Sequence, residues 1–105
     1  MSDDPVERYM ALVEAVLGDE AAKLTPLGAG ILAAAHLGIA ADSRSFAKTL
    51  GIAHALVLRD VDGLADEAGW LMVTKRDPRT QRTFYALTDS AATRLDAASQ
   101  SFLKT

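Results

Sequence analysis

The chain has 105 residues, of which half are hydrophobic and about a quarter are charged. This composition is typical of one globular domain with a single modest core. The absence of cysteine excludes disulfide bonds and thiolate metal sites. No apolar run approaches the ~20 residues of a membrane helix, and the acidic start MSDDPVERY lacks the basic region of a secretory signal. We therefore expect a cytoplasmic protein.

The net charge of −3 at first disfavours nucleic acid as a partner, but the charges are unevenly distributed. Residues 1–30 hold six acids against two bases, whereas the segment Lys75–Arg82 holds four bases against one acid. A local basic cluster is the electrostatic feature that nucleic-acid binding requires, whatever the total charge.

Two helices are expected in the first third of the chain. Asp4-Pro5 is a typical helix start, and it opens a helix over about residues 4–17. Its apolar positions recur at helical spacing and form either a core face or a dimer contact: Val6, Tyr9, Met10, Val13 and Leu17. Thr25-Pro26 then opens a mostly apolar helix that should be buried and end at Gly38. His36 on this helix is expected to be a hydrogen-bonded core or interface residue.

The next segment, about residues 43–68, has the pattern of two helices joined by a tight turn. Asp42 or Ser43 caps the first helix, and Gly51 provides the turn. The inner face of the first helix is predicted to hold Phe46, Ala47 and Leu50. The second helix should run from about His54 to Ala68, and the residues predicted to face the core are Val57, Val61 and Leu64.

A hairpin and a final helix complete the pattern. Two β-prone runs, Trp70–Thr74 and Thr83–Leu87, flank the tip KRDPRTQR, in which Asp-Pro marks a turn. A last helix over about residues 89–103 should place on its inner face Leu95, Ala98 and Phe102. The predicted fold is mainly α with a small β-hairpin, in the order α-α-α-α-β-β-α. It would be a single winged-helix domain over residues 1–105, with a wing at about 70–87.

From about Leu27 to Leu95 these features resemble the MarR-type winged helix-turn-helix transcription regulators. The matching features are the Phe46–Ile52 helix and turn, the core positions Val57, Val61 and Leu64, the Asp77-Pro78 tip followed by Arg82, and Leu87-Thr88 after the second strand. Three departures stand beside them. Ala53 replaces the usual Ser or Thr at the start of the recognition helix, Thr80 replaces an acid that commonly braces the wing arginine, and the terminal helices are short.

The resemblance implies a dimeric repressor that binds operator DNA with a recognition helix in the major groove and a basic wing in the minor groove. The residues suited to contact bases are His54, Ala55, Leu58 and Arg59. Those suited to sense the minor groove are Arg79 and Arg82, and those suited to neutralise phosphates are Arg44, Lys48, Lys75 and Arg76. The acidic second half of the recognition helix (Asp60, Asp62, Asp66 and Glu67) should stay away from phosphates.

Other functions are less well supported by the sequence. The apolar residues Leu56 and Leu58, together with the negative net charge, motivate an alternative in which the winged helix binds a protein and not DNA. Neither a metal site nor a cofactor is expected, and an enzyme is disfavoured because no nucleophile elbow or phosphate loop is present. A small-molecule effector would be expected near Met10, His36 and Trp70.

Overall fold

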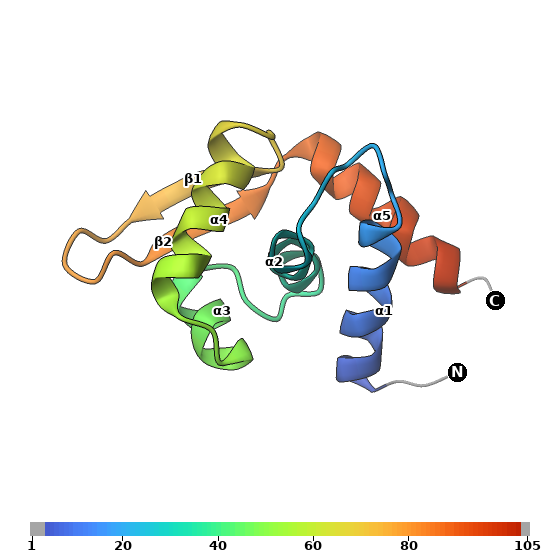
Figure 1. The fold of residues 1–105 in the computed structure, drawn as a ribbon, viewed down its shortest axis with the longest axis horizontal. Coiled ribbons are helices and arrows are strands. Elements are labelled where there is room, and N and C mark those ends of the chain that lie inside the picture. Colours follow the sequence, from blue (N-terminus) through green and yellow to red (C-terminus); the bar gives the residue numbers. More distant parts are fainter. Residues whose placement is uncertain (1–3, 104–105) are drawn as a thin grey trace.

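The computed structural model describes residues 4–103, which form five helices and a two-stranded antiparallel hairpin (Figure 1). The helices are α1 (Pro5–Leu17), α2 (Pro26–His36), α3 (Ser43–Leu50), α4 (His54–Asp66) and α5 (Asp89–Leu103). The strands are β1 (Leu71–Arg76) and β2 (Thr83–Leu87). The described chain is thus mainly helical, and its elements follow the predicted order. Two elements differ in their bounds: α4 ends two residues earlier than expected, and β1 begins one residue later and extends to Arg76.

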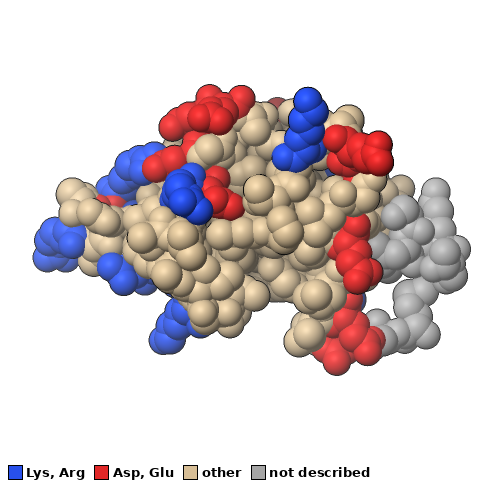
Figure 2. Space-filling view, in the orientation of Figure 1, with Lys and Arg blue, Asp and Glu red and all other residues tan. Residues whose placement is uncertain are grey.

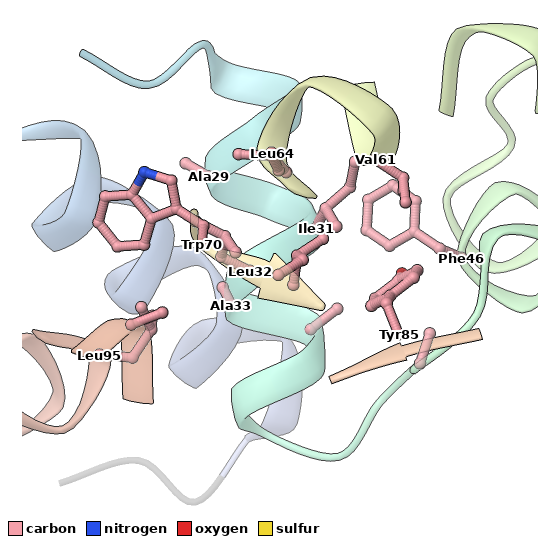
Figure 3. Close-up of a cluster of buried hydrophobic side chains, with 14 of the residues drawn as sticks. Ala29, Ile31, Leu32, Ala33, Phe46, Val61, Leu64, Trp70, Tyr85 and Leu95 are labelled. Atoms are coloured by element: carbon pink, nitrogen blue, oxygen red, sulfur yellow. The ribbon is translucent and has the colours of Figure 1, made fainter. Parts of the chain in front are cut away.

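Helix α2 lies at the centre of the molecule, between α1 and α5 on one side and α4 and the hairpin on the other (Figure 1). Residues 28–34 of this helix are all buried. Figure 3 shows Trp70 and Leu95 on one side of α2 and Phe46 and Tyr85 on the other. A helix surrounded in this way must be apolar on every face, which explains why this segment lacks the polar stripe of the other helices.

Small residues in α2 allow α1 to come close. The Tyr9 hydroxyl of α1 donates a hydrogen bond to the backbone oxygen of Gly30, 3.1 Å away. A Cβ atom at Gly30 would lie only 2.7 Å from that hydroxyl oxygen. Glycine at position 30 therefore makes the observed distance between the two helices possible.

The stripe predicted on the first helix is only partly a core face. Helix α1 contacts the core through Leu12 and Val16, which are buried, and through Tyr9 and Val13, which are partly buried. The remaining members of the stripe are exposed, namely Val6, Met10 and Leu17. Since α1 packs against both α2 and α5, its inward face is centred on Leu12 and rotated away from the predicted stripe.

Exposed apolar side chains of α1 line a shallow groove with the loop after α2 and the end of α3. We call it the apolar groove, and its lining residues are Pro5, Val6, Tyr9, Met10, Ile39, Thr49 and Leu50. Leu50 was expected on the inner face of α3 but is 37% exposed, whereas Phe46 and Ala47 are buried as predicted. The reason is that Leu50 is the last residue of α3, where the helix has already passed the core.

The predicted core face of α4 is confirmed, and that of α5 is confirmed at Leu95 and Ala98. On α4 the buried residues are Val57, Val61 and Leu64. On α5, Leu95 is buried and Ala98 is partly buried against the core, while the side chain of Phe102 lies outside the described residues. No helix within residues 4–103 combines the length and the hydrophobicity needed to cross a bilayer.

The hairpin carries an irregularity that changes the direction of its strand. Leu71 pairs with Leu87 and Val73 with Tyr85, but the register shifts between Val73 and Lys75. A bulge of this kind increases the local twist, and beyond it the rest of β1 is exposed to solvent. On the other edge of β2 the segment before α3 adds a short antiparallel bridge between Asp42 and Phe84. The hairpin is therefore attached to the start of α3.

Candidate nucleic-acid interface

A groove with several basic side chains lies between α3, the turn after it, the start of α4 and the hairpin. We call it the basic groove; its volume is about 730 Å³. Its lining residues are Arg44, Ser45, Ala47, Lys48, Gly51, Ile52, Ala53, His54 and Arg82. Three of these side chains carry a positive charge (Arg44, Lys48 and Arg82), His54 stands beside them, and no acidic residue lines the groove. Such a surface is suited to hold an anion.

The turn between α3 and α4 sets the position of this groove. Gly51 adopts the left-handed conformation, with φ of 67°, and the backbone N–H of Ile52 donates to the oxygen of Ala47 at 2.9 Å. Glycine is favoured at such a position because it has no Cβ. Helix α4 then begins after Ala53, and no side chain caps its first turn. Ala53, which stands where Ser or Thr is usual, therefore leaves this helix start without a side-chain cap.

A buried serine joins α3, α4 and the hairpin. The Ser43 hydroxyl oxygen accepts the backbone N–H of Thr83 at 2.9 Å and lies 2.8 Å from Nε2 of His54. Ser43 itself is fully buried. Burial, followed by the positive charges of Arg44 and Arg82, lowers the pKa of the His54 imidazole, and the Asp42 carboxylate opposes this shift. His54 thus belongs to a hydrogen-bonded network and is not a free contact residue.

Arg82 is braced by an acid that the sequence pattern did not indicate. Thr80 occupies the position where an acid was expected, but Asp42, which precedes α3, has its Oδ1 atom 3.4 Å from Nε of Arg82. The guanidinium of Arg82 also lies over the Phe84 ring, 5.9 Å from its centroid. Asp42 caps α3 at the same time by accepting the backbone N–H of Ser45. A single carboxylate therefore fixes both the start of α3 and the base of the hairpin.

Two further arginines are engaged within the molecule. Arg44 on α3 donates two hydrogen bonds to the backbone oxygen of Thr80, at 2.8 and 3.3 Å. Arg76 on β1 forms an ion pair with Asp62 of α4 at 2.9 Å. Arg44, Arg76 and Arg82 thus hold the hairpin against the two helices, and only part of each guanidinium remains available to a ligand.

Four bases among the predicted site residues have no ion-pair partner within residues 4–103 and are exposed: Lys48, Arg59, Lys75 and Arg79. They come from α3, α4, β1 and the tip of the hairpin. In Figure 2 most Lys and Arg side chains gather at the hairpin end of the molecule, whereas acids cover the far end of α4 and the α1 side. The negative net charge is therefore spatially separated from the basic end.

The first turns of α4 present both apolar and basic side chains to solvent. Ala55, Leu56 and Arg59 are exposed, and Leu58 is partly buried. The second half of the helix is acidic, and two of its carboxylates are engaged, because Asp60 accepts from the Thr25 hydroxyl and Asp62 pairs with Arg76. The structure therefore leaves only the first half of α4 free of acids.

The residues expected around an effector do not converge. Met10 lines the apolar groove, while Nε2 of His36 lies 3.5 Å from Asp96 on α5. Trp70 is buried beneath Arg94, whose guanidinium lies 4.5 Å from the ring centroid. These three side chains thus make separate contacts, and a site for an effector among them stays a prediction. Within the described residues, no three His, Asp or Glu side chains are grouped closely enough to hold a metal ion.

Sequence reasoning missed the roles of Asp42 and Ser43 at this site. One or the other was predicted to cap α3, and Asp42 is the residue that caps it. Their second contacts are with residues about 40 positions further along the chain, Arg82 and Thr83. No local pattern reports such contacts. Comparisons with protein-family models, with curated proteins and with solved structures found no match for this chain.

Proposed function

We propose that this chain is a winged helix-turn-helix protein of the MarR type that binds double-stranded DNA and regulates transcription. In this reading α3 and α4 are the helix-turn-helix, α4 is the recognition helix and the hairpin is the wing. The observation that carries the proposal is the common basic end formed by the basic groove, the start of α4 and the hairpin. Unpaired bases from α3, α4 and the hairpin, gathered at one end of the molecule, would meet the spaced phosphates of a duplex.

The charges restrict how the helix would enter DNA. The first two turns of α4 would lie in the major groove, where Arg59 is suited to hydrogen-bond a guanine. The acidic second half would remain outside, because Asp60 and Asp62 repel phosphates. Lys48 and Lys75 would contact the backbone, and Arg79 at the wing tip would reach the minor groove. The role of Arg44, Arg76 and Arg82 would be mainly to hold the wing in position.

One copy offers few unpaired bases, so two copies would act together. Each phosphate contact adds only a modest, salt-dependent contribution to the affinity. A dimer on a palindromic operator places its two recognition helices about 34 Å apart, which is one turn of DNA. We expect the terminal helices to form the dimer, and repression by occupying the operator is the mode we propose.

The proposal is tested by fluorescence anisotropy with random and genomic-upstream duplexes at two salt concentrations. We expect binding that weakens steeply with salt, and a Lys48→Ala/Arg79→Ala variant that binds more weakly and lowers the salt slope by about 2 for each protomer bound. Arg8→Ala, which removes an exposed base from α1, is the matched control and should bind as the wild type does. Absence of binding at low salt would reject the proposal.

A second function is favoured by one observation, the exposure of Leu56. This side chain is 43% exposed at the front of α4, where a DNA reader usually carries polar groups. In the alternative, α4 binds an apolar surface of a partner protein. A Leu56→Gln substitution separates the two functions, because it would abolish binding to a protein while leaving the salt-dependent affinity for DNA nearly unchanged.

A further inference from the structure

We propose that His54 links DNA binding in the basic groove to the uptake of a proton, so that affinity for DNA rises as the pH falls below neutrality. This inference rests on the proposed DNA-binding function and adds a regulator of the same site. Its structural basis is the position of His54, which is the first residue of α4 and lines the basic groove.

The hydrogen bonds around Ser43 accommodate a neutral ring. The Ser43 oxygen already accepts the backbone N–H of Thr83, so its own proton is available to donate. Nε2 of His54 lies 2.8 Å from this oxygen and accepts that proton when the ring carries its own proton on Nδ1. The arrangement is satisfied by a neutral imidazole that carries its proton on Nδ1.

The charged groups around the ring act in opposite directions. Arg44 of α3 and Arg82 beside the hairpin disfavour a charged imidazole, and Lys48 of α3 lines the same groove. Asp42 favours the charged form, but this carboxylate is shared with Arg82 and with the backbone N–H of Ser45. Together with partial burial, the arginines lower the pKa of His54 in the free protein.

A DNA phosphate in the basic groove would reverse this balance. Its negative charge offsets Arg44 and Lys48 and gives the N–H groups of the ring an acceptor, which favours the imidazolium. When His54 is protonated, Nε2 donates to Ser43, whose oxygen has two lone pairs and can still accept from Thr83. The proton therefore adds a charge to the groove without breaking the contact to the hairpin.

The sign of the effect follows from linkage. The pKa of His54 is higher in the complex than in the free protein, so binding takes up a proton at any pH between the two values. In that window the affinity rises as the pH falls, by at most about tenfold per pH unit for one proton. Above both values the pH has no effect through this residue.

The test is a set of anisotropy titrations with one random duplex between pH 5.5 and 8 at constant ionic strength. For the wild type we expect affinity to rise as the pH falls through this range, by up to about tenfold per pH unit for one proton. His54→Gln should give a flat profile. His36→Gln is the matched control, because the chain has only two histidines, and it should keep the wild-type slope.

Two outcomes would overturn the inference while leaving DNA binding intact: a flat wild-type profile, or a slope that persists in His54→Gln. Failure of any duplex to bind at any pH would instead reject the DNA-binding function, and the inference would fall with it. Nuclear magnetic resonance of the histidine rings in the free protein gives a separate check that needs no DNA. A neutral His54 ring protonated on Nε2, or a His54 pKa of 6.5 or above, would contradict the mechanism.

Discussion

Two tyrosine hydroxyls near the centre of the molecule have different surroundings. The Tyr9 hydroxyl donates to the backbone oxygen of Gly30. The Tyr85 hydroxyl is buried and has no hydrogen-bond partner within the described residues. Burial, followed by the nearby Asp42 carboxylate, raises the pKa of Tyr85 well above its ordinary value. At the scale of single residues, a hydrogen-bonded hydroxyl adds stability, whereas a buried unpaired hydroxyl reduces it.

This difference predicts opposite effects for the same substitution. Tyr85→Phe should raise the free energy of unfolding by about 1 kcal/mol, because it removes an unpaired polar group. Tyr9→Phe should lower it by about 1 kcal/mol through loss of the hydrogen bond to Gly30. Urea unfolding followed by the fluorescence of Trp70, the single tryptophan, measures both. Equal losses in the two variants would contradict the description of Tyr85.

Glycines give a second prediction at this scale. Gly63 lies inside α4, and an added Cβ there would meet no atom within 4 Å. Gly63→Ala should therefore stabilise the protein by up to about 1 kcal/mol, since alanine is the better helix former. Gly51→Ala, with φ of 67°, should instead destabilise it by about 1 kcal/mol. Thermal unfolding of the two variants distinguishes them, and a loss of stability in Gly63→Ala would show that this position is more crowded than described.

At the scale of elements, the hairpin depends on contacts that come from the helices. Asp42 reaches Arg82, Arg44 reaches the backbone of Thr80, and Asp62 reaches Arg76. Two isolated strands are marginally stable in water. The position of the hairpin relative to α4, and hence the shape of the proposed DNA surface, follows from these contacts with α3 and α4.

Asp42 provides a test of this coupling. Asp42→Ala removes both the α3 cap and the brace of Arg82, and we expect a loss of about 1–2 kcal/mol in unfolding free energy. Asp42→Asn keeps a capping oxygen and loses only the charge, so its loss should be clearly smaller. Urea unfolding of both variants gives the comparison. If the two variants lost the same stability, the contribution would come from the charge and not from the cap.

At the scale of the whole molecule, its two ends differ in character. The described residues span 45 × 27 × 19 Å, with bases gathered at the hairpin end and acids over the α1 side (Figure 2). Val6 and Met10 of the apolar groove remain largely exposed, at 67% and 50%. The proposed dimer through the terminal helices would cover such residues while leaving the basic ends free for DNA.

Oligomeric state measured by sedimentation tests this arrangement. We expect the wild type to sediment at twice the 11.1 kDa mass of the chain and Met10→Glu to sediment as the single chain, because a buried unpaired carboxylate is costly. Met72→Glu is the matched control, since Met72 is 52% exposed but lies on the hairpin, and it should remain dimeric. A monomeric wild type, or dissociation caused by Met72→Glu alone, would reject a dimer through α1.

The sequence alone determined those features that depend on neighbours a few positions apart. Asp42 and Gly51 mark the ends of α3, the spacing of Val57, Val61 and Leu64 defines the inner face of α4, and the β-prone runs lead to the hairpin. Capping, helical periodicity and turn chemistry operate over one or two turns of chain, so they can be read directly from the order of residues. The bulge after Val73 was not predicted, because no residue near it carries a specific signal.

Only the tertiary structure decided which charges are free and which apolar faces are covered. Arg82 forms an ion pair with Asp42 and Arg76 with Asp62, while His54 is hydrogen-bonded to Ser43. These three side chains are therefore less free to contact a ligand than their positions in the sequence suggested. The exposed stripe on α1 was likewise decided by where α2 and α5 pack. Ion pairs and burial depend on the distance between atoms in space, and residues far apart in the sequence acquire that distance only when the chain has folded.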